Sequence, residues 1–298
     1  MIRLGINTMI WSGRFEQADS PLLEKIRAWG YEVVEVPLFD FRAVDVKPLR
    51  RAVASSGLAL TVSSALPAGF GLVSADGAIR RATREWLSQA VETVAAIGGT
   101  LLVGPMYAPV SELPGHRRTE AEWRWAIDEY RHLGATIAGC GVRIAVEPLN
   151  RFETWFLNTA EDARRLGDEI GSDSIGTLFD TFHAGIEENN ISAALASLEG
   201  RLFHVHLSEN NRGIPGCGHV PFAAVMETLR TMRYSGHAVV ESFASSIPEI
   251  ARATAMWRDY ASSPDDFAMR AIGNLRPLFT ADASEPCGAN ERIGGATA

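Results

Sequence analysis

Residues 100–149 read TLLVGPMYAPVSELPGHRRTEAEWRWAIDEYRHLGATIAGCGVRIAVEPL and contain a complete strand–helix–strand unit. Nearly continuous apolar runs in Thr100–Met106 and Arg143–Leu149 predict two strands that are buried on both faces. Between them, Glu120–Ala138 has the spacing of an amphipathic helix, and Gly139 follows where that helix must end. Such a unit is typical of a parallel sheet covered by helices.

The same alternation recurs along the chain, with amphipathic segments such as Ala78–Ile97 between the strands. Eight units predict a (β/α)₈ TIM barrel, an α/β fold in which residues 1–280 form a single catalytic domain. A doubly wound sheet is the alternative, but the G-x-G-x-x-G string that this fold usually carries after its first strand is absent. The strand candidates are Arg3–Thr8, Glu32–Leu38, Ala59–Ala65, Thr100–Met106, Arg143–Leu149, Gly176–Phe182, Leu202–Ser208 and Ala238–Phe243.

Composition narrows the class of protein. The chain has 298 residues, of which 46% are hydrophobic and 21% charged, so it can fill a large core and is not a disordered chain. Its net charge of −8 disfavours nucleic acid and anionic membranes as partners, and a small neutral substrate fits better. Residues 281–298 are small, polar and glycine-rich, which predicts a flexible C-terminal tail.

Three cysteines without a CxxC pair argue against a disulfide framework or a structural zinc site. The first residues, MIRLGINTMIW, do not resemble a secretory signal, and no run approaches the length of a membrane span. We therefore expect a soluble, cytoplasmic protein that is not bound to a membrane.

Metal-binding side chains stand at the ends of the last four predicted strands, where TIM barrels place their catalytic groups. A single Glu or Asp after a strand is usually a helix cap or a loop residue, but four consecutive strands repeat the feature. Three carboxylates converging in an apolar barrel would repel one another unless a cation neutralised them. We therefore predict one divalent metal ion, of the type Mn²⁺, Mg²⁺ or Co²⁺. The predicted ligands are Glu147, Asp180, His206 and Glu241.

Strand seven offers two histidines, His204 and His206, which are two residues apart and therefore face the same side. His206 lies nearer the mouth of the barrel and is the predicted ligand. We expect His204 to pack beneath it, in contact with the site but not with the metal.

Four strings carry a family resemblance: EPLNRFET (147–154), DTFHAGIEE (180–188), HVHLSENNRGIPGCG (204–218) and VVESF (239–243). In this order they resemble the D-tagatose 3-epimerase / D-psicose (allulose) 3-epimerase family of the xylose-isomerase-like TIM-barrel superfamily. The superfamily needs only the four metal ligands, whereas LNRFE and NNRG-x-PG-x-G narrow the resemblance to ketose 3-epimerases. The similarity runs from Leu4 to about Leu278.

The resemblance implies a metal-dependent isomerase that interconverts free ketoses such as D-tagatose, D-fructose or L-ribulose at C3, usually with Mn²⁺. Glu147 and Glu241 would also be the acid/base pair. Glu153, His183 and Arg212 match the positions that hold the O1–O3 end of the sugar. Relatives assemble as dimers or tetramers, so the resemblance also implies a homodimer or homotetramer.

The chemistry agrees with this assignment. Epimerisation removes a proton alpha to the C2 carbonyl and returns one to the opposite face, through a cis-enediolate that a metal stabilises as a Lewis acid. Two carboxylates on opposite faces then supply one base and one acid. Trp11, Phe152, Trp155 and Phe243 are candidates for an apolar wall against the sugar.

Free ketoses are favoured over phosphate esters, since only Arg151 and Arg212 lie near these strand ends. The loops after strands three and four do not identify the preferred sugar.

Three other functions fit the sequence less well than a ketose 3-epimerase. An aldose–ketose isomerase resembling hydroxypyruvate isomerase would share the metal ligands, but LNRFE with Glu153 and Arg212 favours the epimerase. An abasic-site endonuclease would need more histidine ligands and a basic face. A sugar-binding or scaffold protein would be expected to have lost a ligand or a base, and this chain retains them all.

Overall fold

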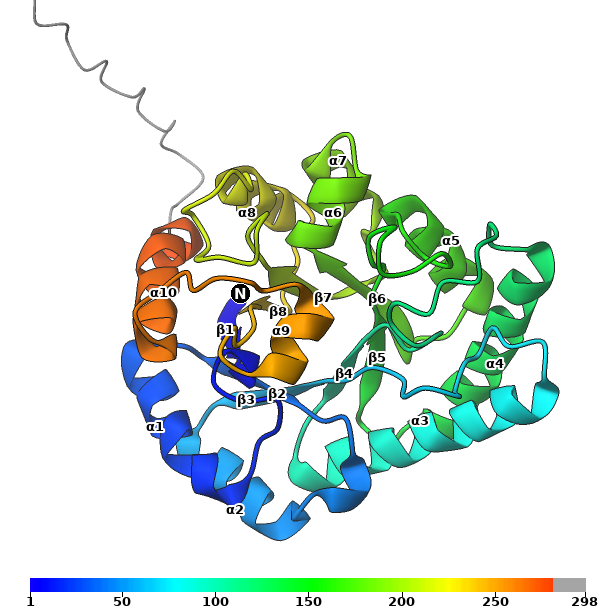
Figure 1. The fold of residues 1–298 in the computed structure, drawn as a ribbon, viewed down its shortest axis with the longest axis horizontal. Helices are drawn as coiled ribbons and strands as arrows, with labels where there is room; N and C mark the ends of the chain where they lie inside the picture. Colours follow the sequence, from blue (N-terminus) through cyan, green and yellow to red (C-terminus); the bar gives the residue numbers. More distant parts are fainter. Residues whose placement is uncertain (281–298) are drawn as a thin grey trace, which may run out of the picture.

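A computed structural model describes residues 1–280, so the predicted tail lies outside the described residues. Eight parallel strands close into a barrel in which each strand pairs with the next along the chain and β8 pairs with β1 (Figure 1). The TIM-barrel prediction is confirmed and the doubly wound alternative is wrong. The strands are β1 (Arg3–Asn7), β2 (Val33–Pro37), β3 (Ala59–Ser63), β4 (Leu101–Gly104), β5 (Arg143–Val146), β6 (Ile175–Asp180), β7 (Leu202–Leu207) and β8 (His237–Val240).

Helices surround the barrel and connect successive strands (Figure 1). Short 3₁₀ turns, η1 (Thr8–Ile10), η2 (Gln17–Asp19) and η3 (Phe41–Ala43), occur in the loops. The α-helices are α1 (Ser20–Trp29), α2 (Val46–Ser56), α3 (Gly77–Ile97), α4 (Glu120–Ile137), α5 (Ala160–Ile170), α6 (Thr181–Glu187), α7 (Ile191–Ser197), α8 (Phe222–Thr231), α9 (Pro248–Thr254) and α10 (Pro264–Thr280).

Local sequence sets the helix boundaries. Helix α4 begins with a capping box, in which Thr119 accepts from the backbone of Glu122 while the Glu122 side chain accepts from the Thr119 backbone. Helix α3 ends at Gly98, whose φ of 91° is a left-handed conformation that glycine adopts without steric cost. These ends lie within one residue of those that the sequence predicts for the two helices.

Successive side chains along each strand point alternately to the surrounding helices and into the barrel, so the outer core is separate from the barrel interior. Leu101, Val103, Ala145 and Leu178 form a small apolar cluster of their own inside the barrel. Glu147 lies two residues beyond Ala145, and Asp180 lies two residues beyond Leu178. Their side chains therefore point the same way, above this apolar cluster. The period of two therefore delivers the site residues to the interior.

Gly104, at the end of β4, allows close approach of two strands at the mouth. Its φ is 132°, and a Cβ there would lie 2.0 Å from the backbone oxygen of Ser64. Its own carbonyl accepts from the backbone N–H of Glu147 at 3.0 Å. A glycine at this position thus brings the start of the β5 loop, and with it Glu147, into place.

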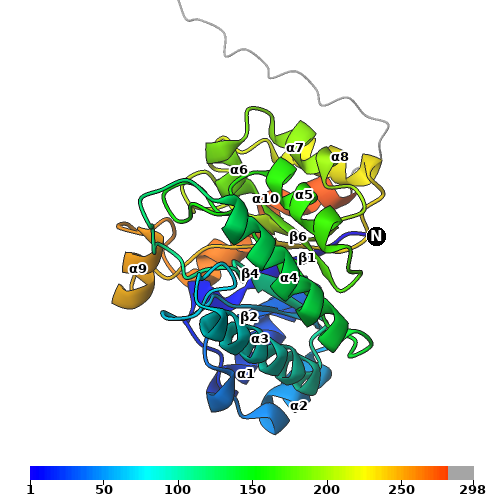
Figure 2. The ribbon, with the colours of Figure 1, turned by 90° about the vertical axis from the view of Figure 1, so that its right-hand side faces the viewer.

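Helix α9 lies over one end of the barrel in Figure 1 and projects from that end in Figure 2. It contributes Ile250, Ala253 and Thr254 to the lining of the cavity described below, so this is the end at which the strands terminate. Within residues 1–280, no helix has the length and apolarity that crossing a membrane would require.

Candidate metal centre and sugar pocket

A cavity of about 860 Å³ opens at the carboxyl ends of the strands. It lies within the range of about 300–1,000 Å³ that is common for small-molecule sites. Six of the seven predicted site residues line the cavity: Glu147, Glu153, His183, His206, Arg212 and Glu241. The seventh, Asp180, lies just behind the lining and contacts the same group of side chains.

The four predicted metal ligands converge on one point. The Nδ1 atom of His206 lies 3.2 Å from Oε1 of Glu241, 3.7 Å from Oδ2 of Asp180 and 3.8 Å from Oε1 of Glu147. All four residues are buried, and one ligand atom from each lies within 4.8 Å of the others. Three oxygens and one nitrogen at these separations could surround a single ion.

The ring of His206 is oriented for this role. Its Nε2 atom lies 2.8 Å from Oε1 of Glu35, which can only accept a proton, so Nε2 is the protonated nitrogen. The other nitrogen, Nδ1, is buried without a hydrogen-bond partner and faces the three carboxylates. A buried nitrogen lone pair aimed at three acidic oxygens fits a divalent cation.

The charges of the site point the same way. Burial raises the pKa of Glu147 to about 8, and the charges of Glu241 and Asp180 add to the rise against the opposing effect of His206. Burial lowers the pKa of His206, but the carboxylates of Glu241 and Glu35 raise it well above its usual value. Without a cation the cluster therefore binds protons, and a metal would replace them.

Arg212 connects the acidic cluster to the pocket. Its Nη1 donates to Glu241 Oε2 at 2.7 Å and to Asp180 Oδ2 at 3.2 Å. Its guanidinium also lies over the ring of Phe182, 3.9 Å from the ring centre. Despite the burial that favours the uncharged form, the charge of Arg212 lowers the pKa of Asp180. The Asp180 carboxylate is thereby held as an anion, and Arg212 fixes the orientation of both carboxylates.

The loop that carries Arg212 is pre-organised. Glu209 is buried and accepts from the backbone N–H groups of Asn210, Gly216 and Val220, at 2.9–3.1 Å. Arg212 itself has a φ of 58°, a left-handed conformation that costs a non-glycine residue about 1–2 kcal/mol. The strained backbone is therefore at the residue whose guanidinium enters the site.

His183 and Glu153 complete one side of the pocket. The backbone N–H of Asn150 donates to His183 Nδ1 at 3.0 Å, and the Asn150 side chain donates to Glu153 Oε1 at 2.8 Å. Burial lowers the pKa of His183 to about 3, so the ring is neutral. The ring nitrogen Nδ1 accepts from Asn150, and the other ring nitrogen, Nε2, lies 3.7 Å from Glu147 Oε1 and 3.1 Å from Arg212 Nη2.

Several residues that hold the site were not found by sequence reasoning. Asn150 lies within the LNRFE string but was not assigned a role, and Ser208 donates to Asp180 Oδ2 at 2.8 Å. Glu35 interrupts the apolar strand VVEVP, and a charge in such a strand was the available signal. His204 packs beneath His206 as expected, with ring centres 5.1 Å apart.

The predicted aromatic wall is wrong for three of its four residues. Phe243 lines the cavity, but Trp11 stacks on Trp29 and donates to Asp265. Trp155 turns its indole N–H toward Glu122, and Phe152 is 70% exposed. Alternation and loop position do not determine which way these rings turn. The apolar lining instead includes Met9, Phe39, Val110, Phe243, Ile247 and Ile250.

The basic residues near the pocket also differ from the expectation. Arg151 does not line the cavity, because it pairs with Glu187 at 2.9 Å on the exterior. Arg14 lines the outer part, where its Nε lies 3.0 Å from Glu16. Among residues 1–280, the guanidinium in the deep part of the cavity is that of Arg212, and it is already paired with carboxylates.

Comparison with known proteins agrees with the fold and the site. The family described as xylose isomerase-like TIM barrel matches residues 23–260, and the chain therefore belongs to this family. Its relatives include proteins named ketose 3-epimerase and L-ribulose 3-epimerase. These relatives confirm the resemblance that the motifs indicated, and with it the prediction of an isomerase that acts on sugars.

Three of these proteins illustrate the similarity. The L-ribulose 3-epimerase of Mesorhizobium japonicum is 31% identical over 262 residues, which are 87% of this chain and 88% of the relative. The ketose 3-epimerase of Arthrobacter globiformis is 29% identical over 285 residues, or 94% and 98% of the two chains. The crystal structure of D-allulose 3-epimerase from Methylomonas sp. superposes with a TM-score of 0.87 at 28% identity, covering 93% and 98%.

Proposed function

We propose that this chain is a metal-dependent ketose 3-epimerase that interconverts free ketohexoses or ketopentoses at C3. The observation that supports this most is the unpaired Nδ1 of His206, which faces three buried carboxylates at the floor of a sugar-sized cavity. We assign Glu147, Asp180, His206 and Glu241 as metal ligands and Mn²⁺ as the ion, with Mg²⁺ or Co²⁺ as substitutes. A bound divalent ion would supply Lewis acidity, which stabilises the negative charge that develops on the sugar's oxygens.

Glu147 and Glu241 are the proposed proton-transfer pair. They follow β5 and β8, which are not neighbours in the barrel, so they reach the cavity from different sides. One carboxylate takes the C3 proton, and the other, as a carboxylic acid, returns a proton to the opposite face of C3. Exchanging the two roles runs the reaction in reverse, so the enzyme should be reversible.

Arg212, His183 and Glu153 are the proposed sugar-holding residues. The neutral His183 presents Nε2 on the side of Glu147, where this nitrogen can form a hydrogen bond with a substrate hydroxyl. Arg212 can add a donor to a hydroxyl while its Nη1 stays on Glu241. Glu153 can accept from a terminal hydroxyl, since Asn150 occupies only one of its oxygens. Together they would fix the end of the sugar that reacts.

The first substrates to assay are L-ribulose and D-allulose, because relatives bear these names. Free sugars are preferred over phosphate esters. Arg14 is the one cation of the outer cavity among the described residues, and it is paired with Glu16 beside a lining that also contains Glu249. A dianionic phosphate would find no unpaired cation there.

The function is tested by isotope exchange. Protein stripped of metal with a chelator should be inactive, and Mn²⁺ should restore conversion of L-ribulose, D-allulose, D-fructose or D-tagatose to the C3 epimer. In D₂O, recovered sugar should carry deuterium at C3. Label at C1 would instead support an aldose–ketose isomerase, and no epimer from any of these sugars would contradict the proposal.

Glu147→Gln and Glu241→Gln should each lower kcat by at least about 10³-fold, because one proton-transfer group is removed. Glu129→Gln is the matched control. Glu129 is also a buried carboxylate, but it pairs with Arg84 on the helical exterior and should leave turnover within about twofold. Cytoplasmic location and assembly as a homodimer or homotetramer stay predictions from the sequence and the family resemblance.

A further inference from the structure

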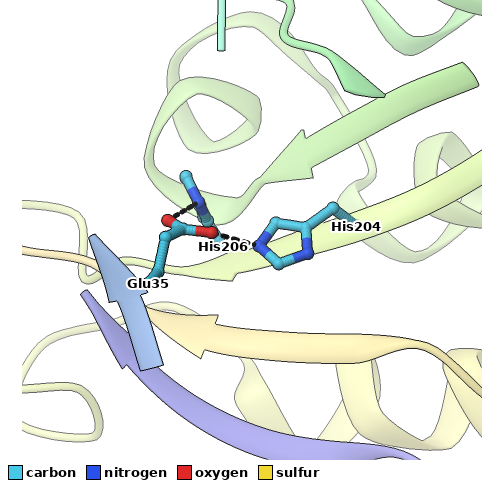
Figure 3. Close-up of side chains that lie close together, drawn as sticks. All are labelled: Glu35, His204 and His206. Carbon is cyan, nitrogen blue, oxygen red and sulfur yellow. Dashed lines mark hydrogen bonds and ion pairs between the residues drawn. The ribbon is translucent and has the colours of Figure 1, made fainter. Parts of the chain in front are cut away.

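Glu35, in β2, is fully buried, accepts hydrogen bonds from three side chains inside the barrel and lies against a fourth, that of His204. Its Oε1 atom accepts from Asn7 Nδ2 and faces His206 Nε2, both at 2.8 Å. Its Oε2 atom accepts from Thr61 Oγ1 at 2.8 Å and lies 2.9 Å from His204 Nε2. Figure 3 shows the carboxylate between the two histidine rings, which come from β7 on another side of the barrel.

Glu35, His204 and His206 could be taken for a second metal site, since they offer three ligand atoms close together. The hydrogen bonds argue against this. A carboxylate has about four acceptor positions. Asn7, Thr61 and His206 occupy three of them, and the ring of His204 lies against the carboxylate as well. A cation on Glu35 would have to displace the donors Asn7 and Thr61. The cluster is therefore organised around the carboxylate.

A buried carboxylate of this kind needs a reason to be retained. Within residues 1–280, no lysine or arginine forms an ion pair with Glu35. Burying a carboxylate is costly even when donors surround it, and an apolar side chain in this strand would fit the surrounding core better. The bond from His206 Nε2 to Glu35 connects this charge to the predicted metal ligands.

We propose that Glu35 is a positioning residue, which holds His206 in the tautomer and orientation that present Nδ1 to the metal. An imidazole ligand commonly donates its second N–H to a carboxylate, which fixes the ring and makes the ligating nitrogen more basic. Here Asn7, Thr61 and His204 fix the carboxylate in turn. The inference rests on the metal site of the proposed function, but it is tested without any sugar.

Glu35→Gln breaks this arrangement with little change in volume. An amide has one oxygen and one NH₂ group, so the NH₂ must face either His206 with Asn7 or His204 with Thr61. In the first case His206 is driven to carry its proton on Nδ1, where it blocks the metal. In the second case the NH₂ group replaces the oxygen that accepts from Thr61 and faces His204. Both outcomes weaken the hold on His206.

The experiment measures the Kd for Mn²⁺ by competition with a chelating dye, alongside the melting temperature of the metal-free protein. Glu35→Gln should raise the Kd about 10–100-fold, the range found for partners of metal ligands. Glu129→Gln, a buried carboxylate between helices α3 and α4, should lower the melting temperature but leave the Kd within about twofold. An unchanged Kd in Glu35→Gln overturns the proposal.

A second measurement keeps the proposal testable if Glu35→Gln does not fold. In wild-type protein with ¹⁵N-labelled histidine and diamagnetic Mg²⁺ bound, the His206 ring should carry its proton on Nε2. A proton on Nδ1 would overturn the proposal. If wild-type protein binds no divalent ion, the metal site of the proposed function fails. If it binds normally and Glu35→Gln matches it, the inference on Glu35 alone fails.

Discussion

Arg212 and Glu241 are joined by a hydrogen bond of 2.7 Å between Nη1 and Oε2, while the other oxygen of Glu241 faces His206. A single carboxylate thus lies between a guanidinium and the nitrogen that would bind the metal. The same guanidinium also reaches His183 Nε2 at 3.1 Å. The position of Arg212 therefore affects both proposed functions of Glu241, metal binding and proton transfer.

Replacing Arg212 by lysine should lower kcat/KM by about 10²-fold or more. An ammonium is a point charge that cannot reproduce the planar fork on Asp180, Glu241 and His183 or the stacking on Phe182. Steady-state kinetics at saturating Mn²⁺ measures the loss. Arg151→Lys is the control, because Arg151 pairs with Glu187 at the exposed exterior and should stay within twofold. Equal kinetics for both variants would contradict the role of Arg212.

Metal should stabilise the folded protein. Binding to the native state alone contributes about 2.7 kcal/mol when Mn²⁺ is at 100 times its Kd. For a chain of this size that corresponds to an increase in Tm of roughly 4 °C. Thermal denaturation with Mn²⁺ and with a chelator measures it. Glu241→Gln should lose most of the increase. A wild-type Tm that is the same with Mn²⁺ and with the chelator would argue against the metal site.

Metal affinity should rise with pH up to about 8. In the metal-free protein, burial raises the pKa of Glu147 to about 8, above its ordinary value, so the carboxyl is protonated at neutral pH. Metal binds the carboxylate, so binding below pH 8 releases this proton, and affinity increases up to tenfold per pH unit. The stability of the metal-free fold changes with pH in the opposite direction. The raised pKa stabilises the metal-free fold at low pH, and that contribution is lost as pH rises from about 4.5 through 8.

Calorimetry of Mn²⁺ binding in two buffers of different ionisation enthalpy counts the released protons. We expect at least one proton at pH 7, and about one fewer in Glu147→Gln. No proton release in the wild type would contradict this account of Glu147.

Gly104→Ala should strongly destabilise the fold. The new Cβ would lie 2.0 Å from the Ser64 carbonyl oxygen, and the φ of 132° is unfavourable for alanine. We expect loss of folded protein or a Tm decrease above 10 °C, measured by circular dichroism. Gly57→Ala is the matched control: its φ is 68°, but no heavy atom lies within 4 Å of the added Cβ. It should cost only about 1 kcal/mol, and similar losses in both variants would show that the contact with Ser64 is unimportant.

The sequence alone determined the eight strand–helix units, because alternation of apolar runs with amphipathic segments is a local property of the chain. It also located Glu147, Asp180, His206 and Glu241, because a TIM barrel places all strand ends at one mouth. The motifs identified the family. The strands were predicted up to three residues too long, since hydrophobicity continues into the buried loops that form the site.

Only the tertiary structure revealed what holds these residues in place. Glu35 and His206 are 171 residues apart, and their contact exists because the barrel closes between β8 and β1. The same closure brings α9 over the mouth, so the apolar wall includes Ile247 and Ile250, and Trp11 turns away to Asp265. Packing between distant segments decides such orientations, and the local pattern of a sequence does not contain that packing.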